Sequence, residues 1–158
     1  MSVKIAPDID KKFIGIPFKE HGRDFDGVDC LGLSYVWYRE HGLVIEGIKT
    51  GENEISKFWW IGNPAHYIEG ITQHGTLHSF SEVRKHDVIL FFDPQNNSAM
   101  PVDAGVMVDD RHFLWMSERL RSSTRMLDAE LKDKFWGALR PFEVVKAARK
   151  VTQKTLIT

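Results

Sequence analysis

The sequence predicts a single α+β domain in which one helix precedes an antiparallel sheet. Residues 30–41 carry apolar side chains at helical spacing, with Cys30, Leu33 and Trp37 on one face. The second half has an apolar run at 88–92 and a strand–turn–strand pattern at 104–117. A helix first and strands after it is the α+β order.

In the first half of the chain, residues that interrupt or cap regular structure indicate where the elements begin and end. The apolar segment 13–18 is interrupted by Gly15 and Pro17, so we expect a packed entry segment rather than a strand or helix. Asp29 can cap the helix, and Gly42 follows its end. The remaining predictions are extended residues at 1–12, a loop at 19–29, an extended segment at 43–45, a charged loop at 49–54, a short helix at 55–61, and a helix from 63 to 73 ended by Gly75.

The second half reads as antiparallel sheet. A buried strand is predicted at 88–92, and a turn-rich loop follows at 93–101. Strands at 104–108 and 112–117 flank a turn at 109–111, which is a hairpin pattern. A short helix within 124–136 and a final strand at 136–141 complete the prediction.

Composition excludes several classes of protein. The 158 residues are 42% hydrophobic, enough for one domain with a core. The net charge of −1 argues against nucleic-acid binding by the chain as a whole, and a single cysteine excludes an internal disulfide. No run is long enough for a membrane span, and the first residues lack the apolar region of a signal peptide. We therefore expect a product that is made in the cytoplasm and leaves the cell by another route.

Cys30 is the candidate nucleophile. A thiol at a helix N-terminus lies beside unpaired backbone N–H groups at the positive end of the helix dipole, and both favour the thiolate. The alternative is that Cys30 is a small core residue, because free cysteines are often buried. A cysteine peptidase also needs a histidine base, a group that orients it, and N–H donors for the oxyanion.

The residues around Cys30 resemble a known family. The segment Gly15-Ile16-Pro17-Phe18, then Gly22, then Gly27-Val28-Asp29-Cys30-Leu31-Gly32-Leu33 resembles the NlpC/P60 cell-wall cysteine peptidases, and is most similar to the version encoded in phage tail modules. The resemblance covers residues 13–141. It implies a papain-like fold with the cysteine helix packed on a small antiparallel sheet, peptidoglycan stem peptides as substrate, and no cofactor. It also places Phe18, where the family has tyrosine, and Asp29 at the substrate groove.

Two further departures concern the catalytic partners of Cys30. The resemblance puts Asp103 in the place of the histidine base and Trp115 in the place of its orienting residue. An aspartate, with an ordinary pKa of roughly 4, is a poor base for a thiol with a pKa near 8.5. A carboxylate beside Cys30 would also raise the pKa of the thiol. Tryptophan can neither accept a proton nor change charge.

Other histidines could substitute. His21 lies in the loop before Cys30, and His112 lies on the 104–117 hairpin, on the strand face opposite Trp115. The sequence does not place His66, His74, His78 or His86 near Cys30. His74 and His78 have the spacing of a metal pair, but Gly75 between them argues against a helix, so we expect no metal site.

These observations support two hypotheses. In the first, residues 13–143 form an NlpC/P60-like domain that has lost its chemistry and serves as a tail-tip, tail-hub or tail-assembly protein of the virion. Its partners are then other phage tail proteins, with 58–60 and the basic tail 144–158 as docking surfaces and 1–12 as an N-terminal extension. In the second, Cys30 cleaves stem peptides of peptidoglycan with an unexpected histidine as base.

Overall fold

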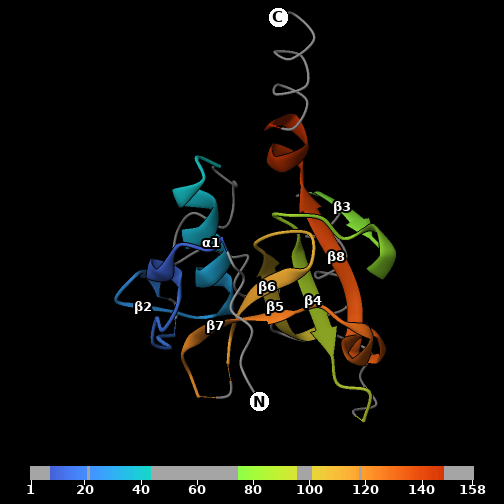
Figure 1. The fold of residues 1–158 in the computed structure, drawn as a ribbon, viewed down its shortest axis with the longest axis horizontal. Coiled ribbons are helices and arrows are strands. Elements are labelled where there is room, and N and C mark those ends of the chain that lie inside the picture. Colours follow the sequence, from blue (N-terminus) through green and yellow to red (C-terminus); the bar gives the residue numbers. More distant parts are fainter. Residues whose placement is uncertain (1–7, 21, 44–74, 96–100, 118, 148–158) are drawn as a thin grey trace, which may run out of the picture.

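The fold has two layers, because one helix lies against one face of an antiparallel sheet (Figure 1). The computed structural model describes residues 8–20, 22–43, 75–95, 101–117 and 119–147. The helix α1 spans Cys30–Glu40, and the sheet has six strands in the order β3-β8-β4-β5-β6-β7. This confirms the predicted α+β fold with the cysteine helix packed on an antiparallel sheet.

In the described part of the chain, 3-10 helices precede two of the six strands, β4 and β8. The strands are β3 (Gly75–His78), β4 (Val88–Phe92), β5 (Pro101–Met107), β6 (His112–Met116), β7 (Ser122–Met126) and β8 (Phe135–Pro141). Two short strands, β1 (Arg23–Asp24) and β2 (Gly27–Val28), pair separately in the loop before α1, and the 3-10 turns are η1 (Lys11–Phe13), η2 (Phe80–Glu82) and η3 (Ala129–Lys134).

The start of α1 is fixed by its cap. The carboxylate of Asp29 accepts a hydrogen bond from the backbone N–H of Gly32 at 2.7 Å, which confirms the predicted capping role. Gly32 is required for packing as well: a Cβ there would lie 2.1 Å from the backbone oxygen of Gly22. The glycine-containing loop therefore rests directly on the first turn of the helix.

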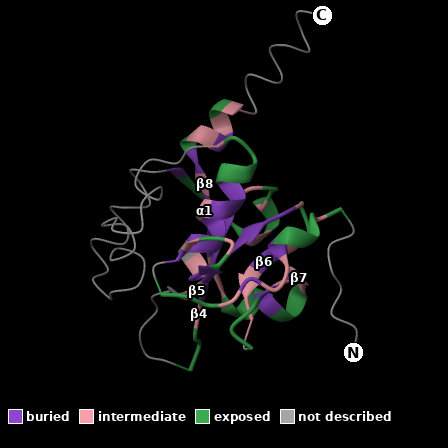
Figure 2. Cartoon of the chain, turned by 90° about the vertical axis from the view of Figure 1, so that its left-hand side faces the viewer, coloured by how far each residue is buried: buried purple, intermediate pink, exposed green. Residues whose placement is uncertain are grey.

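Successive side chains of a strand point to opposite faces of the sheet, and apolar residues are buried on both faces. Much of the sheet and of α1 is coloured as buried in Figure 2. One face packs against Leu33, Val36 and Trp37 of α1. The opposite face is covered in part by Leu131 of η3. The first face is formed by Val88, Leu90, Ala104, Val106, Leu114 and Leu139, and the second by Ile89, Phe91, Met107, Phe113 and Ala138.

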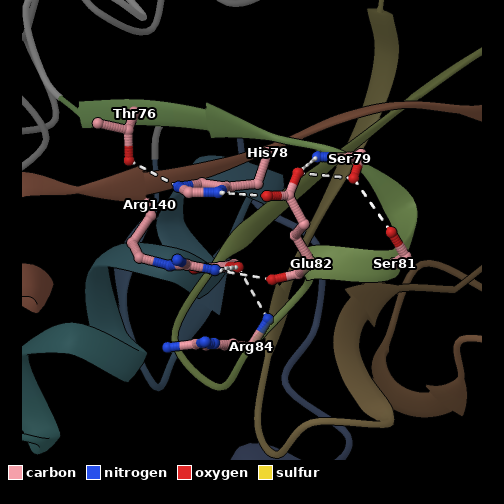
Figure 3. Close-up of polar contacts among 8 residues, drawn as sticks. Thr76, His78, Ser79, Ser81, Glu82, Arg84 and Arg140 are labelled. Atoms are coloured by element: carbon pink, nitrogen blue, oxygen red, sulfur yellow. Dashed lines mark hydrogen bonds and ion pairs between the residues drawn. The ribbon is translucent and has the colours of Figure 1, made fainter.

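A buried ion pair closes one end of the sheet. The side chain of Asp87 is fully buried, and both of its oxygens accept hydrogen bonds from Arg140 at 2.9 Å. The Asp87 carboxylate also accepts the backbone N–H of Arg84, and Arg140 donates to the carbonyl of Glu82. Figure 3 shows Arg140, Arg84 and Glu82 of this cluster, beside the capping contacts between Ser79 and Glu82. The cluster ties β8 to the start of β4.

The strand predictions at 88–92 and 136–141, the turn at 109–111 and the hairpin around it are confirmed. The pattern missed β3 and β7. Gly75, which was expected to follow a helix, is the first residue of β3. The segment 124–136 contains the last three residues of β7 and also the 3-10 helix η3, where a short helix was predicted. The sequence of β7 is Ser-Ser-Thr-Arg-Met, which lacks the apolar alternation that marks a strand, although Ser122 and Thr124 are buried.

The described residues at both ends of the predicted domain 13–143 pack against its core. Residues 11–13 form η1 instead of an extended segment, and the buried Phe13 joins the core. Residues 142–147 are helical, and Val144 is buried beside α1's core cluster, so packing continues past residue 143. The predictions for 44–74, including 58–60, and for 148–158 lie outside the described residues. Within the described part of the chain, no helix is long and apolar enough to cross a membrane.

Candidate functional site

Cys30 is the first residue of α1, as predicted, and it is partly exposed. Its position gives the thiol the positive end of the helix dipole and the N–H groups of the first turn. These are the features that a thiolate nucleophile needs at the start of a helix.

The loop before Cys30 is held by a partly buried ion pair. The guanidinium of Arg23 lies 2.9 Å from the carboxylate of Asp29 and also donates to the carbonyl of Gly22. Phe18, at the other side of this loop, is 46% exposed and donates its backbone N–H to Leu120. The structure thus gives Asp29 a structural role, and its place in a substrate groove, like that of Phe18, stays a prediction.

Asp103 and Trp115 lie on the sheet face opposite α1. Asp103 pairs with Phe91 across β4 and β5, and Trp115 pairs with Gly105 across β5 and β6. Phe91 belongs to the apolar cluster on the second face, and Trp115 packs against that cluster. The helix that carries Cys30 instead contacts the first face, through neighbours such as Ala104. The predicted catalytic partners therefore share a face with each other but not with α1.

Asp103 and Trp115 line one pocket of about 420 Å³. Its apolar floor includes Phe91 and Phe113, and η3 contributes Leu131. Its charged groups are Asp93, Asp103, Arg125 and Lys134. Arg125 and Lys134 were not predicted as site residues. Arg125 lies on β7, whose sequence lacks the pattern of a strand, and Lys134 is the last residue of η3.

Asp103 and Arg125, two charged groups of this pocket, have different surroundings. Burial raises the pKa of Asp103, and a hydrogen bond from the backbone N–H of Ala104 opposes that shift in part. The Arg125 guanidinium lies 6.0 Å from the centre of the Trp115 ring, within cation–π range. Arg125 also lies 3.9 Å from Glu130, an 84% exposed carboxylate.

Two histidines cluster at the far end of α1. His41 caps the C-terminus, and its ring lies 3.9 Å from that of Trp37. Trp37 donates its indole N–H to Nδ1 of His86 at 2.8 Å, and Tyr38 donates to the His86 carbonyl. Burial, with the nearby charges of His41 and Lys85, lowers the pKa of His86 to about 4. An 11-residue helix separates this cluster from Cys30 by roughly 16 Å.

The other two described histidines are also distant from Cys30. His112 forms a salt bridge with Asp109 at 3.0 Å at the β5–β6 turn. This turn lies near the His86 end of α1, because the His86 N–H donates to the carbonyl of Met107. His78 is on the edge strand β3, separated from β5 by β8 and β4. As predicted, His112 shares its strand face with Leu114 and not with Trp115.

The predictions for His21 as a substitute base and for a metal site both involve residues outside the described ranges. His21, the other substitute base, lies outside the described residues, so its place is still a prediction. Among the residues that are described, no group of three or more histidine, cysteine or acidic side chains could hold a metal ion.

The comparison with solved structures identifies the fold. No family model matches the chain, and no curated protein resembles it in sequence. Solved structures with similar folds include the NlpC/P60 domain of the peptidoglycan hydrolase SagA, with TM-score 0.51 and 17% identity over 82% of this chain and 90% of that domain. An NlpC/P60 family protein from Bacillus cereus matches with TM-score 0.54 and 18% identity over 82% of this chain and 36% of its own length. A lipoprotein-like member from Staphylococcus aureus matches with TM-score 0.52 and 17% identity, over 83% and 38% respectively. The chain spans little more than a third of the latter two proteins, and the likeness shows the NlpC/P60 fold.

Proposed function

We propose that this chain uses the NlpC/P60 fold without peptidase activity, as a component of a phage tail. The observation that carries the proposal is the pair Asp103 and Trp115, which stand where the resemblance expects a histidine base and its orienting residue. These side chains lie with Phe91, Phe113 and Arg125 in a pocket on the face opposite α1. Neither can serve as an efficient general base for a thiol at neutral pH.

The positions of the histidines support the same proposal. Within the described residues, His41, His86 and His112 lie toward the C-terminal end of α1, and His78 lies on an outer strand. A base must come within hydrogen-bond reach of the group whose proton it takes. These four histidines therefore lie far from the start of α1, which carries Cys30.

The assignment to a phage tail rests on sequence. The segment 15–33 is most similar to the NlpC/P60 version found in phage tail modules, as described above. In this setting the fold contributes binding surface, and the partners are other tail proteins. Mass spectrometry of purified virions, followed by cross-linking of the intact tail, tests this assignment. Absence of the chain from the particle would contradict a structural role and leave an assembly role.

An active peptidoglycan endopeptidase is the second candidate. It is favoured by Cys30, which retains its place at the start of a helix that Asp29 caps. The SagA domain with a similar fold is described as part of a peptidoglycan hydrolase. This candidate requires a base from His21 or from another chain.

One digestion experiment separates the two candidates. Purified peptidoglycan is incubated with the wild-type protein and with Cys30→Ala, and the soluble fragments are identified by mass spectrometry. We expect no new stem-peptide fragments from either protein. Fragments that appear with the wild type and vanish with Cys30→Ala would establish the endopeptidase and refute the non-catalytic proposal. A folded active NlpC/P60 peptidase, digested in parallel, shows that the substrate is competent.

A further inference from the structure

The pocket opposite α1 has opposite charges on the two sides of an aromatic floor. Asp103 stands on β5 at one side, and Arg125 stands on β7 at the other. Trp115 and Phe113 lie between them on β6. Gly105, which pairs with Trp115, adds no side chain to this part of the face, and a Cβ there would lie 2.9 Å from the Phe113 ring.

Strand geometry sets the distance between the charged groups. Asp103 is four residues from Met107, roughly 13 Å along β5. Met107 pairs with Phe113, which pairs with Arg125, so Arg125 lies two strands away, roughly 10 Å. The two Cα atoms are therefore roughly 16 Å apart, and the side chains shorten the gap. The remaining gap between the carboxylate of Asp103 and the guanidinium of Arg125 equals the length of two or three extended residues, at roughly 3.5 Å each.

The cation at one end is available to a ligand. The Arg125 side chain is 40% exposed, and its partner Glu130 is more exposed and 3.9 Å away, a weak surface pair. Lys134 and Asp93, which also line the pocket, are exposed and carry opposite charges, so together they add no net charge to it. Arg125 is therefore the group best placed to bind a carboxylate, which it can do with two parallel hydrogen bonds.

The acid at the other end is suited to a cation. Asp103 is partly buried, and among the described residues its carboxylate accepts a hydrogen bond from the backbone N–H of Ala104. Carboxylates in such surroundings gain from a positively charged partner that offsets the loss of water. The aromatic floor between Asp103 and Arg125 provides apolar area for the part of a ligand between its charged ends.

From this arrangement we infer that the pocket binds a short peptide of two or three residues with both ends free. Its ammonium group contacts Asp103, its carboxylate contacts Arg125, and an apolar side chain rests on Trp115 and Phe113. The inference goes beyond the proposed function, because it assigns a ligand class to this pocket whether or not Cys30 is reactive.

The test uses the tripeptide Ala-Leu-Ala, its N-acetylated form and its C-terminal amide, titrated into the full chain by isothermal calorimetry. We expect the free peptide to bind. N-acetylation and C-amidation should each weaken it by about tenfold or more, the loss of one charge-assisted contact.

Variants identify which end contacts which side chain. Arg125→Gln should weaken the free peptide and abolish the difference between the acid and the amide, while preserving the effect of N-acetylation. Asp103→Asn should do the converse. Lys132→Gln, which changes an exposed lysine of η3 outside the pocket, is the matched control and should change nothing.

Absence of binding at millimolar peptide would overturn the inference. So would binding that none of these variants alters, or losses that do not follow this pairing of ends and residues. Because the Arg125 side chain is 40% exposed, its variant is expected to fold even where Asp103→Asn does not. The peptide is recovered after titration and weighed by mass spectrometry: cleavage would contradict the proposed function and not the inference.

Discussion

Replacing Arg140 should destabilise the protein strongly, because the buried carboxylate of Asp87 would lose its ion-pair partner. Asp87 is fully buried, and its two oxygens each accept a hydrogen bond from Arg140 at 2.9 Å. In Arg140→Met the carboxylate would retain only the backbone N–H of Arg84 among these contacts. Breaking one partner of a buried pair costs about 3–5 kcal/mol. Because the Arg140 side chain is 14% exposed, we expect a value near the lower bound, about 3 kcal/mol.

The loss is measurable by urea and thermal unfolding. For a domain of this size, about 3 kcal/mol corresponds to a fall in Tm of roughly 6–12 °C. Arg111→Met is the matched control, since Arg111 is exposed at the β5–β6 turn, and its Tm should stay at the wild-type value. The double variant Asp87→Asn with Arg140→Met should be less destabilised than the sum of its parts, because the stranded charge is gone. An Arg140→Met protein as stable as the control would refute the assignment of the ion pair as a structural clamp.

Three further predictions concern α1. Asp29→Ala removes the cap on Gly32 and should cost about 1–2 kcal/mol in urea unfolding, with Asp29→Asn losing less; equal losses would argue against capping. Gly32→Ala places a Cβ 2.1 Å from the Gly22 oxygen and should cost about 1–3 kcal/mol, whereas an unchanged midpoint would show that the loop is not packed there. His86 is neutral in the fold down to a pKa of about 4, while the unfolded chain takes up the proton below about 6.5, so stability should fall as the pH drops between these values. His86→Asn cannot titrate and tolerates the positive φ of 76°, so its pH profile should be flatter over that range; an identical profile would exclude His86 as the cause.

Local signals determined much of the fold. The capped helix that begins at Cys30 follows from the periodicity of Leu33 and Trp37 and from the short carboxylate of Asp29. The strand at 88–92 and the hairpin around 109–111 follow from apolar runs broken by a polar turn. Each of these signals involves residues close together in the chain, so it can be read without knowledge of the partners.

The weakly patterned strands could be assigned only from their neighbours. β7 is polar in sequence and becomes a strand because its backbone pairs with β6, with Thr124 beside Leu114 and Arg125 beside Phe113. β3 likewise forms against β8. Each of these edge strands is stabilised by backbone hydrogen bonds to its neighbouring strand. The side-chain pattern of an edge strand does not predict those bonds.

The sequence by itself determined the chemistry of the candidate site: a cysteine at a helix start, and an aspartate and a tryptophan on neighbouring strands. The tertiary structure decided which face they occupy. Strand pairing puts Asp103 and Trp115 away from α1 and brings Arg125 beside them. It also joined Asp87 to Arg140, 53 residues apart. Such contacts depend on strand order and register, which are set by the packing of the whole core and not by any one segment.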